Sequence, residues 1–172
     1  MPEIAEMVSP NAGLLNYELR KVRALMLLAV RVQDELAFPR GPDGSKLSIS
    51  YFLSGEFQGE RLRGKVIPGG GDWAVYRSPD HLDIEVRAVL KTCDGAIIYL
   101  RYEGLWRATP GALSLVFARD GYSHYKEDQH YLRVFARFET ADSRYEWLNG
   151  ILALGVGVPT VDGVTYEFLE ML

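Results

Sequence analysis

The stretch RLRGKVIPGGGDWAVYRSPDHLDIEVRAVLKTCDG, residues 61–95, decides the fold class. Apolar and polar residues alternate on both sides of a glycine-rich corner, Pro68-Gly69-Gly70-Gly71-Asp72-Trp73. Alternation with a period of two is typical of a β-strand with one buried face. Three glycines in a row within such sequence indicate a positive φ angle or a close backbone approach. The corner is interpreted either as the rim of a small-molecule pocket or as a plain turn beside a core tryptophan.

The strand pattern recurs at short intervals along the chain. Asp94-Gly95, between two alternating runs, predicts a β-hairpin, because glycine supplies the positive φ angle that the turn needs. Residues 38–46 are expected to form a loop, and residues 141–149 one short helix with Thr140 or Asp142 as its N-cap. Many short strands separated by turns indicate an all-β sandwich or barrel. The expected strands are 25–32, 47–57, 61–67, 73–77, 82–91, 96–106, 113–118, 131–138, 151–158 and 164–169.

Length and composition limit the classes of function. A chain of 172 residues predicts one domain, here residues 14–172 after a flexible tail, 1–13. The net charge of −4 argues against nucleic-acid binding, which relies on clustered basic residues. The apolar run 24–30 is too short to span a bilayer. The single cysteine, Cys93, excludes an internal disulfide, so we expect a cytoplasmic protein.

The usual catalytic motifs are missing from the sequence. Residues 41–46 do not have the spacing of a phosphate-binding loop, and the triple glycine opens no helix that would hold a dinucleotide. The three histidines, His81, His124 and His130, lack the spacing of metal ligands. We therefore expect no cofactor and no metal.

A set of acids, arginines and aromatic residues remains as the candidate site. Such residues perform cofactor-free acid–base chemistry where burial shifts a carboxyl pKa, but the same residues also form ordinary surface ion pairs. Spacing alone does not separate the two interpretations. The set comprises Asp72, Trp73, Glu85, Arg87, Tyr102, Arg133, Glu139, Trp147 and Asn149.

Strand 82–91 shows why the orientation of the faces matters. One of its faces is apolar, whereas the other carries Asp83, Glu85, Arg87 and Lys91. The polar face is either the solvated exterior of an antiparallel sheet or the wall of a wet barrel lumen. The residues alone favour the solvated exterior.

Three motifs, in order, resemble the family known as domain of unknown function 3237. They are GERLRGKVIPGGGDW (59–73), EVRAVLKTCDGAIIYLRYEG (85–104) and YLRVFARFETADSRYEWLNGILALGVG (131–157), and the likeness covers roughly residues 14–170. The chain departs from the family pattern at Glu85, where aspartate is commoner, and at Cys93, where a polar residue is commoner. Residues 108–129 are also longer and more aromatic than the resemblance leads us to expect.

The resemblance implies a single-domain, calycin-like antiparallel β-barrel with one short helix, a central cavity and a tendency to dimerise. With a barrel implied, the lumen interpretation of the polar face gains over the exterior one. Some relatives belong to the breakdown of plant-derived aromatic compounds, where a cofactor-free decarboxylation of a phenolic acrylate side chain is attributed to the family.

The resulting hypothesis is a cofactor-independent lyase or isomerase acting on a small aromatic, anionic substrate. Arg87 or Arg133 would hold the substrate carboxylate, Asp72 or Glu85 would donate the proton, and Tyr102 would be a second donor. Trp73 and Trp147 would stack on the substrate ring, beside Glu139 and Asn149 of the last motif. The alternative is a barrel that binds a small hydrophobic ligand without turnover. A solvent-filled lumen of roughly a few hundred Å³ with at least one arginine and one carboxylate would favour the enzyme, and an apolar lumen without a convergent acid would favour the binder. An apolar strand face without a partner predicts a homodimer.

Overall fold

The computed structural model describes residues 21–39, 41–42, 44–117 and 125–172, most of which lie in β-strands. The predicted tail, residues 1–13, lies outside them. The strands are β1 (Val22–Val32), β2 (Leu36–Pro39), β3 (Lys46–Gln58), β4 (Arg63–Ser78), β5 (His81–Thr92), β6 (Ile97–Ala108), β7 (His130–Glu139), β8 (Ala153–Thr160) and β9 (Gly163–Met171).

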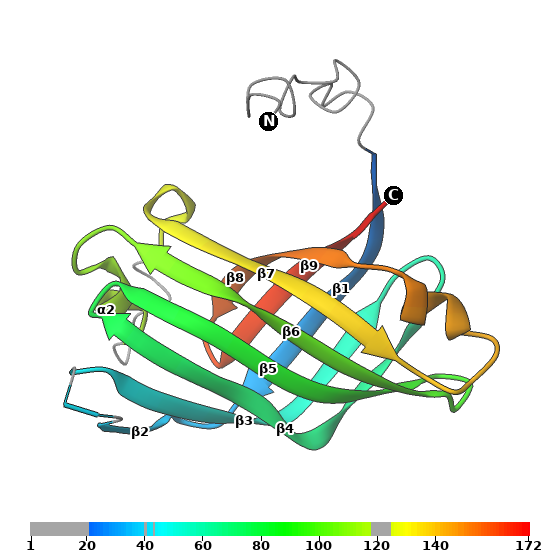
Figure 1. Ribbon diagram of the computed structural model, residues 1–172, viewed down its shortest axis with the longest axis horizontal. Helices are drawn as coiled ribbons and strands as arrows, with labels where there is room; N and C mark the ends of the chain where they lie inside the picture. The colour runs from blue at the N-terminus through cyan, green and yellow to red at the C-terminus, as the bar shows by residue number, and fades with distance from the viewer. Residues whose placement is uncertain (1–20, 40, 43, 118–124) are drawn as a thin grey trace, which may run out of the picture.

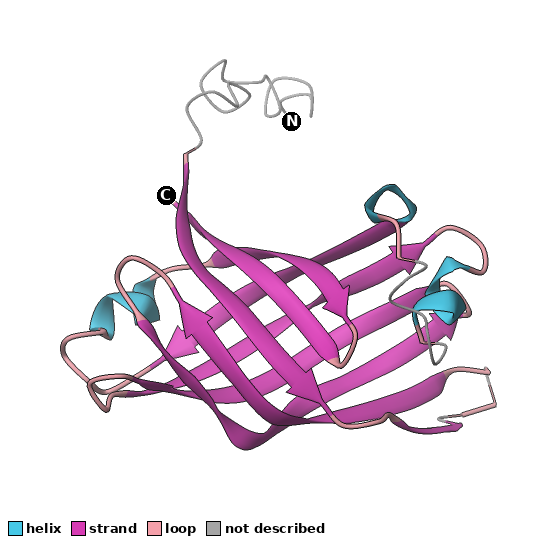
Figure 2. Ribbon diagram, turned by 180° about the vertical axis from the view of Figure 1, so that it is seen from behind, coloured by secondary structure: helices cyan, strands magenta, loops and turns pink. Residues whose placement is uncertain are grey.

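Eight of these strands close into an antiparallel barrel (Figure 1). Neighbours along the chain pair from β3 to β9, and β1 closes the ring because it pairs with β9 on one side and with β3 on the other. Figure 2 shows this closure from behind. The short strand β2 pairs with β3 alone, at positions 36–39. The barrel with one short α-helix confirms the predicted fold class.

The glycine-rich corner is a bulge within one long strand. Residues 61–67 and 73–77, expected as two strands, are joined in β4, and the pairing with β5 shifts between Ile67 and Gly71. Gly69 has a φ angle of 106°, and a Cβ on Gly70 would lie 2.5 Å from the carbonyl oxygen of Arg87. Both reasons for which the sequence would need glycine therefore apply here. The bulge bends β4 and leaves Asp72 inside the barrel.

The short helices lie at the two ends of the barrel (Figure 1). Helix α2 (Ala112–Val116) replaces the strand expected at 113–118, because Pro110-Gly111 begins a turn and Gly111 takes a φ angle of 80°. The 3₁₀ helix η4 (Glu146–Gly150) occupies part of the predicted helix 141–149. A second 3₁₀ turn, η3 (Glu127–Gln129), precedes β7. The expected loop 38–46 is partly strand, since β2 extends to Pro39.

Side chains fill the barrel unevenly. The apolar faces of the strands point inward, so the face that favoured a homodimer is the barrel core; the homodimer itself stays a prediction. Toward η4 the interior is packed by large buried side chains, among them Phe57, Leu90, Ile98, Phe138 and Leu148. The half of the barrel nearer to α2 is hollow instead.

Candidate functional site

A cavity of about 90 Å³ lies inside the barrel in the half nearer to α2. Its wall is mostly apolar, with a few hydroxyl groups and one carboxylate, and none of its described lining residues is a lysine or an arginine. The apolar lining with few polar groups is typical of a small-molecule site, but the volume is below the roughly 300–1,000 Å³ of most such sites. The lining residues are Val32, Ser48, Ser50, Phe52, Asp72, Ala74, Tyr76, Leu82, Ile84, Val86, Tyr102, Trp106, Phe117, Leu132, Gly163, Val164 and Tyr166.

Asp72 supplies the carboxylate of the cavity. It follows the β4 bulge and shares the inward face of that strand with Ala74 and Tyr76. Burial raises the pKa of Asp72 to about 7; the hydrogen bond from the backbone N–H of Glu85 (3.1 Å) opposes this rise, and the charge of Glu85 adds to it. Asp72 is therefore both a proton donor and a proton acceptor near neutral pH.

Two buried tyrosines stand on the cavity wall with Asp72. The Tyr102 and Tyr166 rings meet edge to face with their centres 5.2 Å apart. Burial raises the pKa of each hydroxyl well above its usual value, and the charge of Asp72 raises both further. Both side chains therefore stay neutral hydrogen-bond donors. Tyr102 belongs to the predicted site, whereas Tyr166 was missed, although its alternation with Phe168 gives it an inward face.

Next to the cavity, near β2, four polar side chains contact one another: Glu35, Lys46, Ser48 and Tyr76. Glu35 accepts hydrogen bonds from the Ser48 hydroxyl (2.5 Å) and from the Tyr76 hydroxyl (3.3 Å). The ammonium group of Lys46 lies 4.0 Å from Glu35 and 4.5 Å from the centre of the Tyr76 ring. Sequence reasoning missed this group because Glu35 lies in a segment without strand pattern. Alternate residues of a strand share a face, so the inward position of Asp72 could have predicted that Ala74 and Tyr76 also point inward.

Three predicted residues do not line the cavity but lie on the outer side of the barrel wall: Trp73, Glu85 and Arg87. Glu85 and Arg87 are exposed on β5 and form an ion pair with each other (2.6 Å), and the Arg87 guanidinium lies 6.0 Å from the centre of the Trp73 ring. Strand alternation is the physical reason, because Val86 between them points inward. The expectation that this polar face lines the lumen is not met. Arg87 therefore does not reach a ligand in the cavity.

Arg133 is also directed away from the cavity. It lies on β7 next to the inward Leu132, donates to the Leu132 carbonyl oxygen (2.9 Å) and stacks over the Tyr131 ring at 4.9 Å. Both arginines that were expected to hold a substrate carboxylate are thus on the outer surface. The cavity has the predicted acid without the predicted cation.

The remaining predicted residues lie toward the η4 end. Glu139 is exposed at the end of β7, and Asn149 makes two hydrogen bonds with the backbone of Thr140 (2.8 and 2.9 Å). Trp147 packs against the core, with the Arg61 guanidinium 3.7 Å from its ring centre. None of the three lines the cavity. The structure thus brings together only Asp72 and Tyr102 of the nine candidates.

Comparison with known proteins places this barrel in a family. The family model described as "Protein of unknown function (DUF3237)" matches residues 21–171. The chain belongs to the DUF3237 family. A UPF0311 protein of Rhodopseudomonas palustris strain CGA009 is 31% identical over 124 residues, which cover 72% of this chain and 79% of that protein. A UPF0311 protein of Clostridium acetobutylicum is 29% identical over 138 residues, 80% of this chain and 82% of the relative.

Solved structures share the DUF3237 barrel. A β-barrel-like protein of Acinetobacter baumannii superposes with a TM-score of 0.75 at 25% identity, covering 89% of this chain and 96% of its own. A Rhodopseudomonas palustris protein of unknown function has a TM-score of 0.79 at 24% identity, with coverages of 89% and 97%. A Penicillium herquei protein described as an enzyme has a TM-score of 0.66 at 17% identity, covering 89% and 95%. The last two likenesses establish the fold alone.

Two further observations on this DUF3237 protein concern metal sites and membrane-spanning helices. Within the described ranges, no three histidine, cysteine or acidic side chains gather as a metal site would require. No helix in the described part of the chain has the length and apolar character to cross a membrane.

Proposed function

We propose that the cavity catalyses cofactor-free proton transfer on a small, uncharged and largely apolar molecule, with Asp72 as the proton-transferring group. The supporting observation is the burial of Asp72 in the cavity, which raises its pKa to about 7. A general acid or base works best when its pKa lies near the working pH, and such a group contributes about 10²–10⁴-fold to the rate. Orientation and hydrogen bonding within the apolar walls must supply the rest.

Of the two predicted reaction classes, isomerisation by proton transfer is better supported than decarboxylation. A decarboxylase must bury a substrate carboxylate, which is costly without a cation or several donors around it. The described lining has neither a lysine nor an arginine, and ionised Asp72 repels a second carboxylate. The Penicillium herquei enzyme adds only that one barrel of this shape is described as catalytic.

Ligand binding without turnover is the second candidate. It is favoured by the mainly apolar lining, to which Phe52, Ile84, Val86 and Leu132 contribute. A binder has no need for an acid whose pKa lies near 7, and this is why we prefer the enzyme.

The test is turnover of a small panel of phenolic acrylates and uncharged aryl ketones. Loss of conjugated absorbance reports decarboxylation, and proton NMR in deuterated water reports exchange of the hydrogens beside a ketone carbonyl. Asp72→Asn, which keeps the shape of the side chain, should slow exchange by about 10²-fold or more. The control is Asp83→Asn, an exposed acid paired with Arg77 on the outer surface, and it should leave the rate unchanged.

Each result decides between the candidates. Exchange that is equally fast in the Asp72 variant and in wild type rules out the proposed role of Asp72. Ligands that bind to wild type without any exchange or absorbance change identify a binding protein. If the protein decarboxylates phenolic acrylates and this activity depends on Asp72, the substrate is anionic, as the sequence led us to expect, and not uncharged as proposed here.

A further inference from the structure

The Tyr102 hydroxyl is a fully buried polar group of the cavity wall. The side chain is 1% exposed and lines the cavity, yet its oxygen has no hydrogen-bond partner among the described residues. A buried hydroxyl without a partner destabilises a fold, and proteins rarely keep one unless it serves another purpose. Here a ligand in the cavity would provide the missing partner.

Three other donors on the wall are already engaged. The Trp106 indole N–H donates to Nδ1 of His130 (3.0 Å), and the Ser48 hydroxyl donates to Glu35 (2.5 Å). Tyr76 also donates to Glu35 (3.3 Å). Tyr102 thus stands beside the Tyr166 and Ser50 hydroxyls as a donor free to meet an acceptor atom of a ligand, and it is the most deeply buried of the three.

The surroundings of Tyr102 keep its proton in place. Its ring packs against Tyr166 and Phe168, with centres 5.2 and 5.7 Å away, and burial raises its pKa well above the usual value. The charge of Asp72 raises that pKa further, which places Tyr102 within electrostatic reach of the acid. A neutral donor and a proton-accepting carboxylate therefore face one small apolar space.

We propose that the substrate is a small ketone, saturated or β,γ-unsaturated, whose carbonyl oxygen accepts a hydrogen bond from Tyr102 while Asp72 moves a proton on the adjacent carbon. This proposal rests on the proposed function and names its substrate class. A carbonyl oxygen is an acceptor without charge, so it enters an apolar cavity at far lower cost than a carboxylate does. Hydrogen bonding strengthens as negative charge develops on that oxygen, which is how such a donor lowers a barrier.

The step balances without a co-reactant. Ionised Asp72 takes a proton from the carbon beside the carbonyl, the C–H electron pair forms a carbon–carbon double bond, and the carbonyl π pair moves onto oxygen. The resulting enolate oxygen is held by the Tyr102 hydroxyl. If the Asp72 acid first exchanges its proton for a solvent deuteron and returns that to the same carbon, the result is exchange; if it delivers the proton to the far end of the dienolate that a β,γ-unsaturated ketone forms, the result is the conjugated isomer. Asp72 ends as it began.

Binding of 4-nitrophenolate tests the role of Tyr102 without turnover. Asp72→Asn imitates the protonated acid, and the phenolate imitates the enolate. In that background, Tyr102→Phe should weaken phenolate binding about tenfold or more, since hydrogen bonds to charged groups are the strong ones. Binding of 4-nitrotoluene, which lacks the oxygen, should not change. Equal phenolate affinity with and without the Tyr102 hydroxyl overturns the proposal.

The thermal midpoint of Tyr102→Phe provides a second measurement. Because the hydroxyl has no partner in the structure, its removal should leave the midpoint unchanged or raise it. A lowered midpoint would mean that the hydroxyl has a structural partner, which contradicts the premise.

Failure of the proposal is distinguishable from failure of the proposed function. Ketone exchange that depends on Asp72 but proceeds at the wild-type rate in Tyr102→Phe leaves the function standing and removes the substrate assignment. Tyr102-dependent phenolate binding with no exchange of any aryl ketone or β,γ-unsaturated ketone removes both, because the cavity would then bind oxygenated ligands without catalysis.

Discussion

The carboxylate of Asp72 accepts a hydrogen bond from the backbone N–H of Glu85 at 3.1 Å, yet the two side chains lie on opposite sides of the barrel wall. Asp72 lines the cavity, whereas Glu85 pairs with Arg87 in solvent. Two acids from the stretch 61–95 thus have different environments, and burial raises the pKa of the inner one, Asp72. The candidate site is defined by this inner acid.

The raised pKa of Asp72 predicts a pH-dependent stability. The folded-state pKa of about 7 lies above the ordinary value of 3.8, so the folded protein binds the extra proton. The contribution of Asp72 is fully present below about pH 3.8 and is lost as the pH rises through about 7. Between these limits the loss amounts to roughly 4 kcal/mol.

Urea unfolding at about pH 5 and about pH 8 measures this loss, since the two values flank the folded pKa. Asp72→Asn removes the titrating group, so the free energy of unfolding of the variant should fall less over that interval than that of wild type. A difference between variant and wild type that is the same at both pH values would contradict a raised Asp72 pKa.

The strand pattern could be predicted from sequence, but the arrangement around the cavity could not. Alternation located most strands, and the apolar face of β5 points inward as its composition requires. The polar face carrying Glu85 and Arg87 was assigned to the lumen through the family likeness, and burial of that many charges in a small barrel is unfavourable. The solvated exterior was the better interpretation.

The surroundings of Asp72 could not be found because they are distant in the chain. Tyr166 lies on β9, and only the closure of β1 onto β3 and β9 brings it to the same wall as Asp72. Glu35 reaches Ser48 and Tyr76 because the β2 that follows it pairs with β3. Pairing across such separations is not encoded in local periodicity. Asn149 was predicted from the sequence as a ligand-binding residue, but its side chain bonds the backbone of Thr140 and does not line the cavity.

The bulge in β4 predicts that Gly70 does not tolerate a side chain. A Cβ there would lie 2.5 Å from the Arg87 carbonyl oxygen and 3.0 Å from the Ala88 Cα, so the paired strands would have to separate. Gly70→Ala should lower the free energy of unfolding by about 1–3 kcal/mol in urea.

Gly150→Ala is the matched control, because a Cβ at Gly150 meets nothing within 4 Å. Its stability should be unchanged or raised by up to about 1 kcal/mol. If the two variants unfold at the same urea concentration, close packing does not explain the glycine at position 70.

Glu170 predicts a second sensitive position, at the end of the barrel where β1 and β9 meet. It is 4% exposed and bonds Arg23 through Nε (3.0 Å), while Arg61 also contacts it from the β3–β4 turn. Glu170→Ala leaves both arginines without their anion. The free energy of unfolding should fall by about 1–3 kcal/mol, because hydrogen bonds to a buried charged group are lost while water can reach the half-exposed arginines.

Asp83→Ala serves as the comparison for this ion cluster. Asp83 pairs with Arg77 at 2.6 Å, but both side chains are well exposed, so the change should cost less than about 1 kcal/mol. Urea unfolding of the two variants at neutral pH compares them directly. If both variants lose the same free energy of unfolding, the burial of Glu170 does not make its ion pairs more stabilising than an exposed pair.

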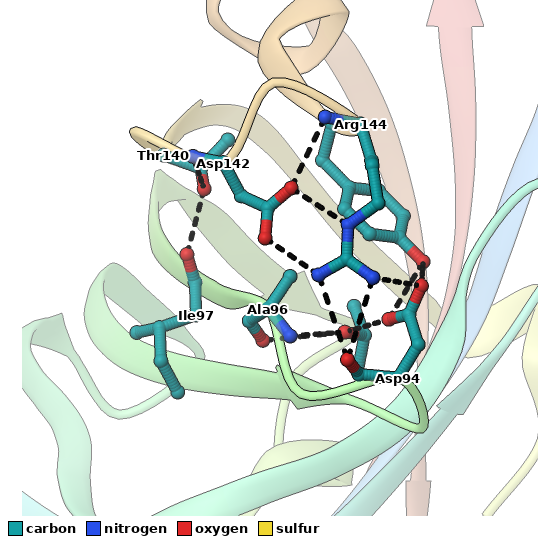
Figure 3. A network of polar contacts seen from close by, with 8 residues as sticks. Asp94, Ala96, Ile97, Thr140, Asp142 and Arg144 are labelled. Atoms are coloured by element: carbon teal, nitrogen blue, oxygen red, sulfur yellow. Dashed lines mark hydrogen bonds and ion pairs between the residues drawn. The ribbon is translucent and has the colours of Figure 1, made fainter.

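The turn between β5 and β6 is joined to the segment before η4 by a polar network that predicts acid sensitivity (Figure 3). Arg144 bonds both Asp94 (3.0 Å) and Asp142 (2.7 Å), and the Tyr145 hydroxyl donates to Asp94 at 3.1 Å. Hydrogen bonds from Arg144 lower the pKa of Asp142 to about 2, and the Thr92 hydroxyl is the main cause of the lowered pKa of Asp94.

Lowered folded-state pKa values mean that this network stabilises the fold above the ordinary carboxyl value of 3.8 and loses that effect as the pH falls toward about 2. Arg144→Met removes the cation that holds both carboxylates but keeps much of the side-chain length. It should lower the thermal midpoint at neutral pH and shrink the difference from wild type as the solution is acidified. The matched control is Arg31→Met, whose partner Asp162 lies in an exposed pair at the β8–β9 turn. An Arg144 variant that loses no more stability than this control at neutral pH would show that the network does not join the two segments.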